Sequence, residues 1–290
     1  MQILKVEAVV TPLEDMIVQP FTGRVVRQIL FKVAEKVEAR ELLEFLSSSA
    51  PRKPYSITPL YRGGVPVFRT PSDSKPLCLR KGLEYGFRAC FVVRSLDIIK
   101  VLYGFLEDVE IYGSKRVSVR ITGTEILDET ALGIPLRPKE TITLCFETPT
   151  LLQLPKLRKK SKINRYLLYP LPSLMVYSLK ENWNAYADWK IKMASWRANY
   201  AFVAVDHRIF PVTTIYDKER KPRGFIGYAT YQIMTKSSKI LEALSKLLHY
   251  ATLTNIGKSR SIGYGVVSVT KLSQISKCRK ILEKYVKTPY

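Results

Sequence analysis

The stretch best suited to hold an anion is the glycine-rich segment 255–267, NIGKSRSIGYGVV. Its glycines are Gly257, Gly263 and Gly265, and its cations are Lys258 and Arg260. Glycines let a backbone approach a ligand with its N–H groups exposed, and cations add charge complementary to phosphate. The segment contains Gly-Lys-Ser, but a nucleotide-binding P-loop also needs a glycine where Thr252 stands, and it follows a strand rather than a helix. The segment therefore predicts a cradle for a phosphate backbone.

The balance of charges indicates a polyanionic ligand. The 290-residue chain has 47 Lys and Arg against 25 Asp and Glu, a formal net charge of +22. A positive field of this size attracts nucleic acid, and 17 tyrosines are available to stack on bases. A basic protein without such a ligand and a membrane-surface binder are the alternatives, and nucleic acid is favoured.

The cysteines and the N-terminal segment indicate the compartment. Cys78, Cys90, Cys145 and Cys278 lie far apart without a CxxC pair, so they predict neither a zinc site nor a disulfide framework and suit a reducing interior. The opening segment QILKVEAVV alternates like a strand and lacks the pattern of a signal peptide, and no apolar run is long enough to span a bilayer. We expect a cytoplasmic protein.

Periodicity in the first half predicts a strand, a helix, two short strands followed by a longer one, a helix and a last strand, in the general order βαββαβ. The expected elements are a strand at 3–10, a helix from 23 to about 46 with a break near Ala39, short strands at 55–61 and 65–69, a strand at 83–93, a helix capped by Ser95, and a strand at 115–127. The second half repeats the order with a strand at 141–147, a long aromatic helix at 174–199, a hairpin at 201–216 and 224–234, a helix at 238–252, a strand at 264–270 and a short helix from 273.

Two βαββαβ units in tandem predict an α+β protein of two ferredoxin-like domains. Such a domain has an antiparallel sheet with helices on one face and leaves the other face open for a ligand. Pro135 and Pro138 interrupt the pattern between the units, so the expected domains are 1–134 and 135–290.

The glycine-rich segment resembles the C-terminal signature of the CRISPR-associated repeat-processing endoribonucleases, the sixth Cas family within the repeat-associated RNA-binding superfamily. The family signature is glycine, apolar residue, glycine, five residues, and again glycine, apolar residue, glycine. Here Asn255-Ile256-Gly257 is followed after five residues by Gly263-Tyr264-Gly265. Only Asn255 departs, and asparagine tolerates positive φ better than most residues. FTGRVVRQILF, KPYSITPLY and RGFIGYATYQ extend a weaker similarity over most of the chain.

The resemblance implies a reaction that uses neither a metal nor a cofactor. A 2′-hydroxyl of the RNA attacks the adjacent phosphodiester and leaves a 2′,3′-cyclic phosphate and a 5′-hydroxyl end. Such a reaction needs a group to take the 2′ proton, one to protonate the leaving oxygen, and cations for the phosphorane. Many members place a histidine in or after the first long helix, where this chain has none. His207 and His249 fall in an expected strand and near the end of an expected helix, where structural roles are more common.

We therefore expect a site without histidine, built from cations of both halves. The candidate catalytic residues are Arg27, Lys53, Tyr55 and Arg223, and the candidate RNA-binding residues are Arg24, Lys221, Gly257, Lys258, Arg260, Gly263 and Gly265. A lysine with a lowered pKa can protonate the leaving oxygen, arginine stabilises developing negative charge, and Tyr55 would position the nucleophile. A solvated surface charge is the alternative for each cation.

Two further segments leave alternatives open. The run KLRKKSKINR, 156–165, has six cations in ten residues and is expected to contact RNA phosphates or to stay solvated. The aromatic residues Trp183, Tyr186, Trp189 and Trp196 could stack on bases, but their helical spacing is more typical of a core or an oligomer contact.

The expected function is binding of CRISPR repeat RNA and cleavage of precursor transcripts into guide RNAs. The alternatives are a non-catalytic RNA-binding subunit of a CRISPR effector complex and a basic DNA-binding or ribosome-associated protein. The missing histidine favours the non-catalytic subunit, whereas the two-domain length and the glycine loop favour the enzyme. Repeat RNA is the expected partner. A CRISPR effector complex and a second copy of the chain are further candidate partners.

Overall fold

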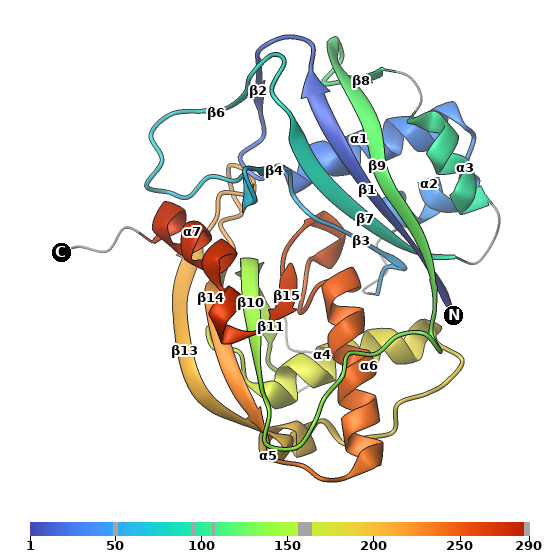
Figure 1. Ribbon diagram of the computed structural model, residues 1–290. Coiled ribbons are helices and arrows are strands. Elements are labelled where there is room, and N and C mark those ends of the chain that lie inside the picture. The colour runs from blue at the N-terminus through green and yellow to red at the C-terminus, as the bar shows by residue number, and fades with distance from the viewer. Residues whose placement is uncertain (49–51, 94–96, 106–107, 156–163, 287–290) are drawn as a thin grey trace. The chain divides into compact units, whose positions relative to one another are not determined.

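A computed structural model of the chain describes residues 1–48, 52–93, 97–105, 108–155 and 164–286 (Figure 1). The described residues divide into two compact units. Unit 1 contains Met1–Thr130 together with two short segments from later in the chain, Thr214–Pro222 and Ser261–Gly263. Unit 2 contains the other described residues. Among these residues, none of the helices combines the length and the apolar character needed to cross a membrane.

Unit 1 contains an antiparallel sheet with the strand order β5-β4-β7-β1-β9-β8, in which β3 also pairs with β7. The strands are β1 (Gln2–Pro12), β3 (Tyr55–Ile57), β4 (Tyr61–Arg62), β5 (Val65–Pro66), β7 (Tyr85–Val93), β8 (Val109–Ile111) and β9 (Lys115–Asp128). A separate two-stranded sheet joins β2 (Met16–Val18) to β6 (Leu77–Leu79).

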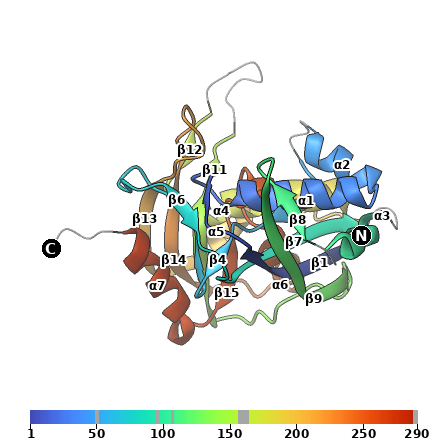
Figure 2. The ribbon, with the colours of Figure 1, turned by 90° about the horizontal axis from the view of Figure 1, so that it is seen from above.

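Three helices accompany this sheet: α1 (Gly23–Lys36), α2 (Arg40–Ser47) and α3 (Asp97–Gly104). Val25, Ile29 and Val33 recur at helical spacing on α1 and are fully buried. They belong to one hydrophobic cluster with the alternate residues of β1 from Leu4 to Val10. Figures 1 and 2 show α1 and α2 on the same side of the sheet.

Unit 2 repeats the arrangement with the strand order β13-β14-β10-β15, again antiparallel. Its strands are β10 (Thr141–Thr150), β13 (Phe202–Thr213), β14 (Arg223–Ile233) and β15 (Val267–Thr270), and its longer helices are α4 (Pro172–Tyr186), α6 (Ser238–Thr254) and α7 (Ser276–Tyr285). The shorter elements are β11 (Leu152–Gln153), β12 (Tyr166–Leu167), α5 (Ala198–Ala201) and the 3-10 turns η1 (Ser195–Arg197), η2 (Arg260–Ile262) and η3 (Leu272–Gln274).

Both units therefore have the ferredoxin-like strand order. In unit 1 the fourth, first and third strands of the motif lie side by side as β9, β1 and β7, with β3 next to β7. In unit 2 the corresponding order is β15, β10, β14 and β13. The prediction of two tandem ferredoxin-like folds with antiparallel sheets is confirmed.

The open sheet face predicted for such folds is partly covered in unit 2. Helix α7 packs on β10 and β14, and its Cys278 and the residue before the helix, Ile275, cluster with Cys145 and Tyr228 of those strands. Tyr231, three residues beyond Tyr228 and so on the opposite face, donates a hydrogen bond to the Pro170 carbonyl just before α4. Because helices approach both faces, nine of the ten residues of β10 are buried.

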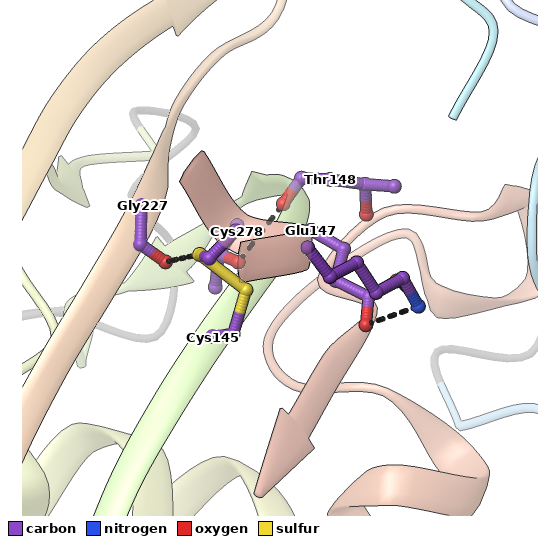
Figure 3. The surroundings of a disulfide bond; sticks show 7 residues. Cys145, Glu147, Thr148, Gly227 and Cys278 are labelled. Atoms are coloured by element: carbon purple, nitrogen blue, oxygen red, sulfur yellow. Dashed lines mark hydrogen bonds and ion pairs between the residues drawn. A yellow bond between two sulfur atoms is a disulfide. The ribbon is translucent and has the colours of Figure 1, made fainter. Parts of the chain in front are cut away.

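A disulfide between Cys145 and Cys278 joins β10 to α7 across 133 residues (Figure 3). The sequence prediction of no disulfide was wrong, because the pairing depends on how α7 crosses the sheet and not on cysteine spacing. The Cα atoms lie 5.9 Å apart, within the range for this bond. Beside it, the buried Glu147 carboxylate receives a hydrogen bond from Lys277 Nζ at 2.8 Å.

The predicted aromatic helix at 174–199 was wrong in its length, since α4 ends at Tyr186. The Trp183 indole N–H donates to the Trp189 carbonyl at 2.7 Å, and the Asn184 side chain bonds both the N–H and the carbonyl of Ile191. These side-chain bonds hold the following segment in a turn back along α4. Trp183 is buried, whereas Trp189 and Trp196 lie outside the helix and are exposed. The hairpin of β13 and β14 is confirmed, and the Ser95 cap lies outside the described residues.

Candidate active site

Three of the four predicted catalytic residues lie together in unit 1, around the side chain of Tyr55. Tyr55 begins β3 and is 4% exposed, and the side chains of Arg27 and Ser261 lie within reach of its buried hydroxyl. Burial raises the pKa of Tyr55, while the positive charge of Arg27 opposes that rise. A protonated phenol enclosed beside a guanidinium can hydrogen-bond a polar group that enters the site.

Lys53 lies next to Tyr55, with its ammonium 5.7 Å from the centroid of the tyrosine ring. Partial burial lowers the pKa of Lys53, and the charge of Arg27 lowers it further. Arg27 comes from α1, and its Nη2 donates to the carbonyl of Leu46 in the last turn of α2. This hydrogen bond fixes the direction of the guanidinium and leaves its other N–H groups for further acceptors.

The segment Ser261–Gly263 belongs to the same unit, and the Ser261 side chain lies near enough to lower the pKa of Tyr55. Gly263 has φ +96°, and a Cβ atom there would lie 2.8 Å from the Pro59 nitrogen. A Cβ on Gly23, at the start of α1, would lie 1.9 Å from the Ile262 carbonyl oxygen. The two glycines therefore let this segment lie against α1 and the chain after β3.

A second basic group in unit 1 surrounds Tyr216, which sequence reasoning did not select. The Arg24 guanidinium lies 5.0 Å from the Tyr216 ring centroid and donates to its carbonyl at 3.4 Å. Arg220 lies 4.6 Å from the same ring and pairs with Asp217. Arg24, a predicted RNA-binding residue, is thus held by an aromatic ring and a carbonyl. Its RNA contact stays a prediction.

Lys221 and Arg223 are exposed residues of the hairpin, in unit 1 and unit 2 respectively. Arg223 begins β14 and stands opposite Thr213 of β13. Within the described part of the chain neither side chain has an ion pair, so both charges are available to an anionic ligand. The catalytic role of Arg223 stays a prediction.

The glycine-rich segment follows α6, as the sequence indicated, and Asn255 has φ +63°, which confirms the turn predicted at the departed glycine position. Cβ atoms on Gly257 and Gly265 would lie 2.5 Å from the Leu151 carbonyl oxygen and 1.8 Å from that of Ile256. Both positions therefore need glycine because two backbones approach closely.

The predicted exposed N–H groups of this segment are largely occupied. Gly257 donates to the Ser178 hydroxyl at 3.1 Å, Lys258 to the Leu151 carbonyl at 3.0 Å, and Gly265 to the Pro149 carbonyl at 3.1 Å. The expected exposure of the glycine N–H groups was therefore wrong at Gly257 and Gly265, because the loop uses these amides to fix its own backbone.

The two cations of the segment differ. Lys258 is exposed, whereas the Arg260 guanidinium turns inward and donates to the Thr254 carbonyl at 3.4 Å. Burial lowers the pKa of Arg260, and the neighbouring Tyr250 and Tyr186 oppose this. These contacts give Arg260 a part in holding the loop, and RNA binding by the segment stays a prediction.

The two histidines have structural contacts in unit 2. His249 Nδ1 accepts a hydrogen bond from the Gly133 N–H at 3.0 Å. The His207 ring packs edge-on against the Tyr169 ring, with 5.5 Å between the ring centroids. Among the described residues, His, Cys, Asp and Glu side chains form no group suited to hold a metal ion. Of the basic run 156–165, residues 156–163 lie outside the described residues.

Comparison with known proteins assigns the family. Residues 4–127 match the family profile of the Cas6 N-terminal domain, and residues 144–267 match that of the CRISPR-associated endoribonuclease Cas6. No curated protein sequence gives a significant match.

Solved structures show the same fold at low sequence identity. A Cas6 product complex is 19% identical with a TM-score of 0.67, over 91% of this chain and 99% of that chain. Cas6 from Thermus thermophilus is 17% identical with a TM-score of 0.62, over 93% of this chain and 98% of that chain. A Cas6-related protein from Pyrococcus furiosus is 13% identical with a TM-score of 0.55, over 93% of this chain and 99% of that chain. With two profiles covering both halves, the chain belongs to the Cas6 family of CRISPR-associated endoribonucleases.

Proposed function

We propose that this protein binds CRISPR repeat RNA and cuts precursor transcripts into guide RNAs in the cytoplasm. The observation that supports this most is the grouping of Arg27 and Lys53 around the enclosed hydroxyl of Tyr55. Its solved relatives include a Cas6 product complex and a Cas6 substrate mimic complex. The net charge of +22 suits an RNA ligand.

In the proposed reaction the 2′-oxygen forms a bond to phosphorus as the bond from phosphorus to the 5′-oxygen breaks. Lys53 donates its proton to the leaving 5′-oxygen, because its lowered pKa makes the ammonium a stronger acid than an exposed lysine. Arg27 stabilises the charge on the phosphorane. Tyr55 stays protonated and positions the 2′-hydroxyl, whose proton passes to solvent.

The test is single-turnover cleavage of an end-labelled repeat RNA in EDTA, beside a copy with a 2′-deoxy substitution at the cut site. We expect cleavage of the first RNA only. Lys53→Ala should slow cleavage about 100-fold or more, since a general acid contributes about this much. Lys32→Ala is the matched control, because it removes a lysine that pairs with Glu35 on the surface of α1. Rates within about twofold of the parent for both Lys53→Ala and Arg223→Ala would contradict the proposed site.

A non-catalytic RNA-binding subunit is the second candidate, favoured by the structural contacts of both histidines. Tight binding of both RNAs without cleavage of either would establish it. Association with an effector complex or as a homodimer stays a prediction, which sedimentation of the purified protein with and without RNA can test.

A further inference from the structure

Two large aromatic side chains lie exposed beside each other just before β13 in unit 2. Trp196 of η1 and Tyr200 of α5 are 58% and 74% exposed, and their ring centroids are 5.7 Å apart with the planes at 86°. Trp196 belongs to the aromatic set for which helical spacing favoured a core or an oligomer contact over base stacking, and the structure places it at the surface. Burial of such rings would stabilise a fold, so an exposed pair marks a surface for a ligand.

The backbone beneath the two rings is fixed. Ala198 and Ala201 of α5 are buried, and Asn199 accepts a hydrogen bond from the Ser173 N–H at the start of α4 at 2.9 Å. At the other end of α5, the Met234 N–H donates to the Ala201 carbonyl at 2.9 Å. A fixed base lets both rings meet a ligand with little loss of conformational entropy.

The local charge favours an anionic ligand. The Arg197 guanidinium lies 5.7 Å from the Trp196 ring centroid. The segment 187–201 between α4 and β13 has three cations against the single acidic residue Asp188, and of these cations Arg197 is the one placed beside the rings. Aromatic faces beside cations are the combination with which proteins bind single-stranded nucleic acid, because bases stack on the rings while phosphates meet the cations.

A partner strand on the edge of β13 fits this surface less well. Val203 and Val205 are also exposed there, but the register of β13 against β14 shifts between Ala204 and Asp206, and Pro211 follows. Bulges and prolines are features by which edge strands avoid pairing with another chain.

We propose that Trp196, Tyr200 and Arg197 form a stacking site for unpaired bases of single-stranded RNA. The site rests on the proposed function, because its ligand is an unpaired stretch of the same transcript. It lies in unit 2, whereas the Tyr55 group lies in unit 1. Base stacking is tolerant of sequence, so the site would strengthen binding of any unpaired segment without selecting its bases.

The test is fluorescence anisotropy with a labelled oligouridine RNA, measured over a range of salt concentrations. Trp196→Ala should weaken binding roughly 5- to 150-fold, as loss of one stacked base does, while Trp196→Phe retains most of the affinity. The salt slope should stay unchanged in Trp196→Ala and fall by about one in Arg197→Ala, because only the arginine contacts phosphate. Tyr103→Ala is the matched control, since Tyr103 is 69% exposed on α3.

Single-turnover cleavage and sedimentation separate the outcomes. Trp196→Ala at saturating RNA should cut at the parental rate, because the rings act in binding. If the parent cuts no RNA but Trp196→Ala still loses oligouridine affinity, the proposed function fails and the stacking site stands. Unchanged oligouridine affinity in both Trp196→Ala and Tyr200→Ala would overturn the site, and a change in self-association alone would assign the rings to a protein interface.

Discussion

Gly263→Ala provides the sharpest test of how the glycine segment supports the Tyr55 site. Gly263 has φ +96°, and a new Cβ would lie 2.8 Å from the Pro59 nitrogen and 3.2 Å from the Thr58 carbonyl carbon. The opposing backbone cannot easily move, because two hydrogen bonds hold Thr58 to Arg88. The Thr58 N–H donates to the Arg88 carbonyl at 2.8 Å, and the Thr58 hydroxyl accepts from the Arg88 N–H at 2.9 Å. The substitution must therefore displace Ser261–Gly263, and with it Ser261, from Tyr55.

The expected loss of stability follows from three contributions. A left-handed backbone costs a residue with a Cβ about 1–2 kcal/mol. Overlap with a fixed neighbour costs about 1–3 kcal/mol more. The reduced freedom of the unfolded chain returns about 0.4–1 kcal/mol. The free energy of unfolding should therefore fall by roughly 1–5 kcal/mol, with about 3 kcal/mol as the central value.

Gly64→Ala is the matched control, because Gly64 has φ +80° and no described atom within 4 Å of the new Cβ. This variant places a Cβ on a left-handed backbone but creates no overlap with a neighbour, so we expect its free energy of unfolding to fall by about 1 kcal/mol. Urea unfolding measures the two losses, and single-turnover cleavage well below the unfolding midpoint measures the effect on the site. Equal midpoints for the two variants, with cleavage by Gly263→Ala within about twofold of the parent, would refute the reasoning.

Three further predictions concern other positions. Cys278→Ser should lower the free energy of unfolding by about 2–5 kcal/mol, because the bond to Cys145 closes a loop of 133 residues. A reducing agent should shift the urea midpoint of the parent but not of this variant. The free energy of unfolding of Asn255→Gly should lie within about 1 kcal/mol of that of the parent, and Asn255→Ala should be less stable than both. The reason is that the backbone angles at this position, φ +63° and ψ 172°, strain any residue with a side chain. In a pH–rate profile, cleavage should fall with rising pH as the Lys53 ammonium loses its proton, from a lower pH than an ordinary lysine would give, because burial and Arg27 lower its pKa; Lys53→Arg should lack this falling limb.

Local patterns predicted the parts of the fold that depend on local burial. The alternation of Leu4, Val6, Ala8 and Val10 predicted β1, and the polar turn between two alternating segments predicted the β13–β14 hairpin. The same reasoning failed beyond Tyr186, where the helical spacing of Trp183, Trp189 and Trp196 continues but the helix does not. The helix ends there because the side chains of Trp183 and Asn184 bond a later segment, which periodicity does not describe.

The disulfide and the glycine contacts depend on packing between distant segments. Cys145 and Cys278 meet only because α7 returns across β10, and Gly23 is needed only because Ile262 lies against the start of α1. The sequence located the glycines, but their backbone freedom was interpreted as exposing N–H groups to a ligand. The close approach of Gly257 to Leu151 explains those glycines instead by backbone packing, which no local property of the sequence could predict.

The structure also distinguishes three of the predicted arginines from Lys53. Arg24, Arg27 and Arg260 each donate to a backbone carbonyl, whereas no such bond fixes the Lys53 ammonium among the described residues. A guanidinium keeps several N–H groups after one such bond, so it can hold a fixed direction and still bind an oxyanion without reorganisation. It cannot release a proton in a protein, whereas a partly buried lysine can. The proposed division of roles, with arginine stabilising charge and Lys53 transferring the proton, therefore follows from the chemistry of the two side chains together with where each is held.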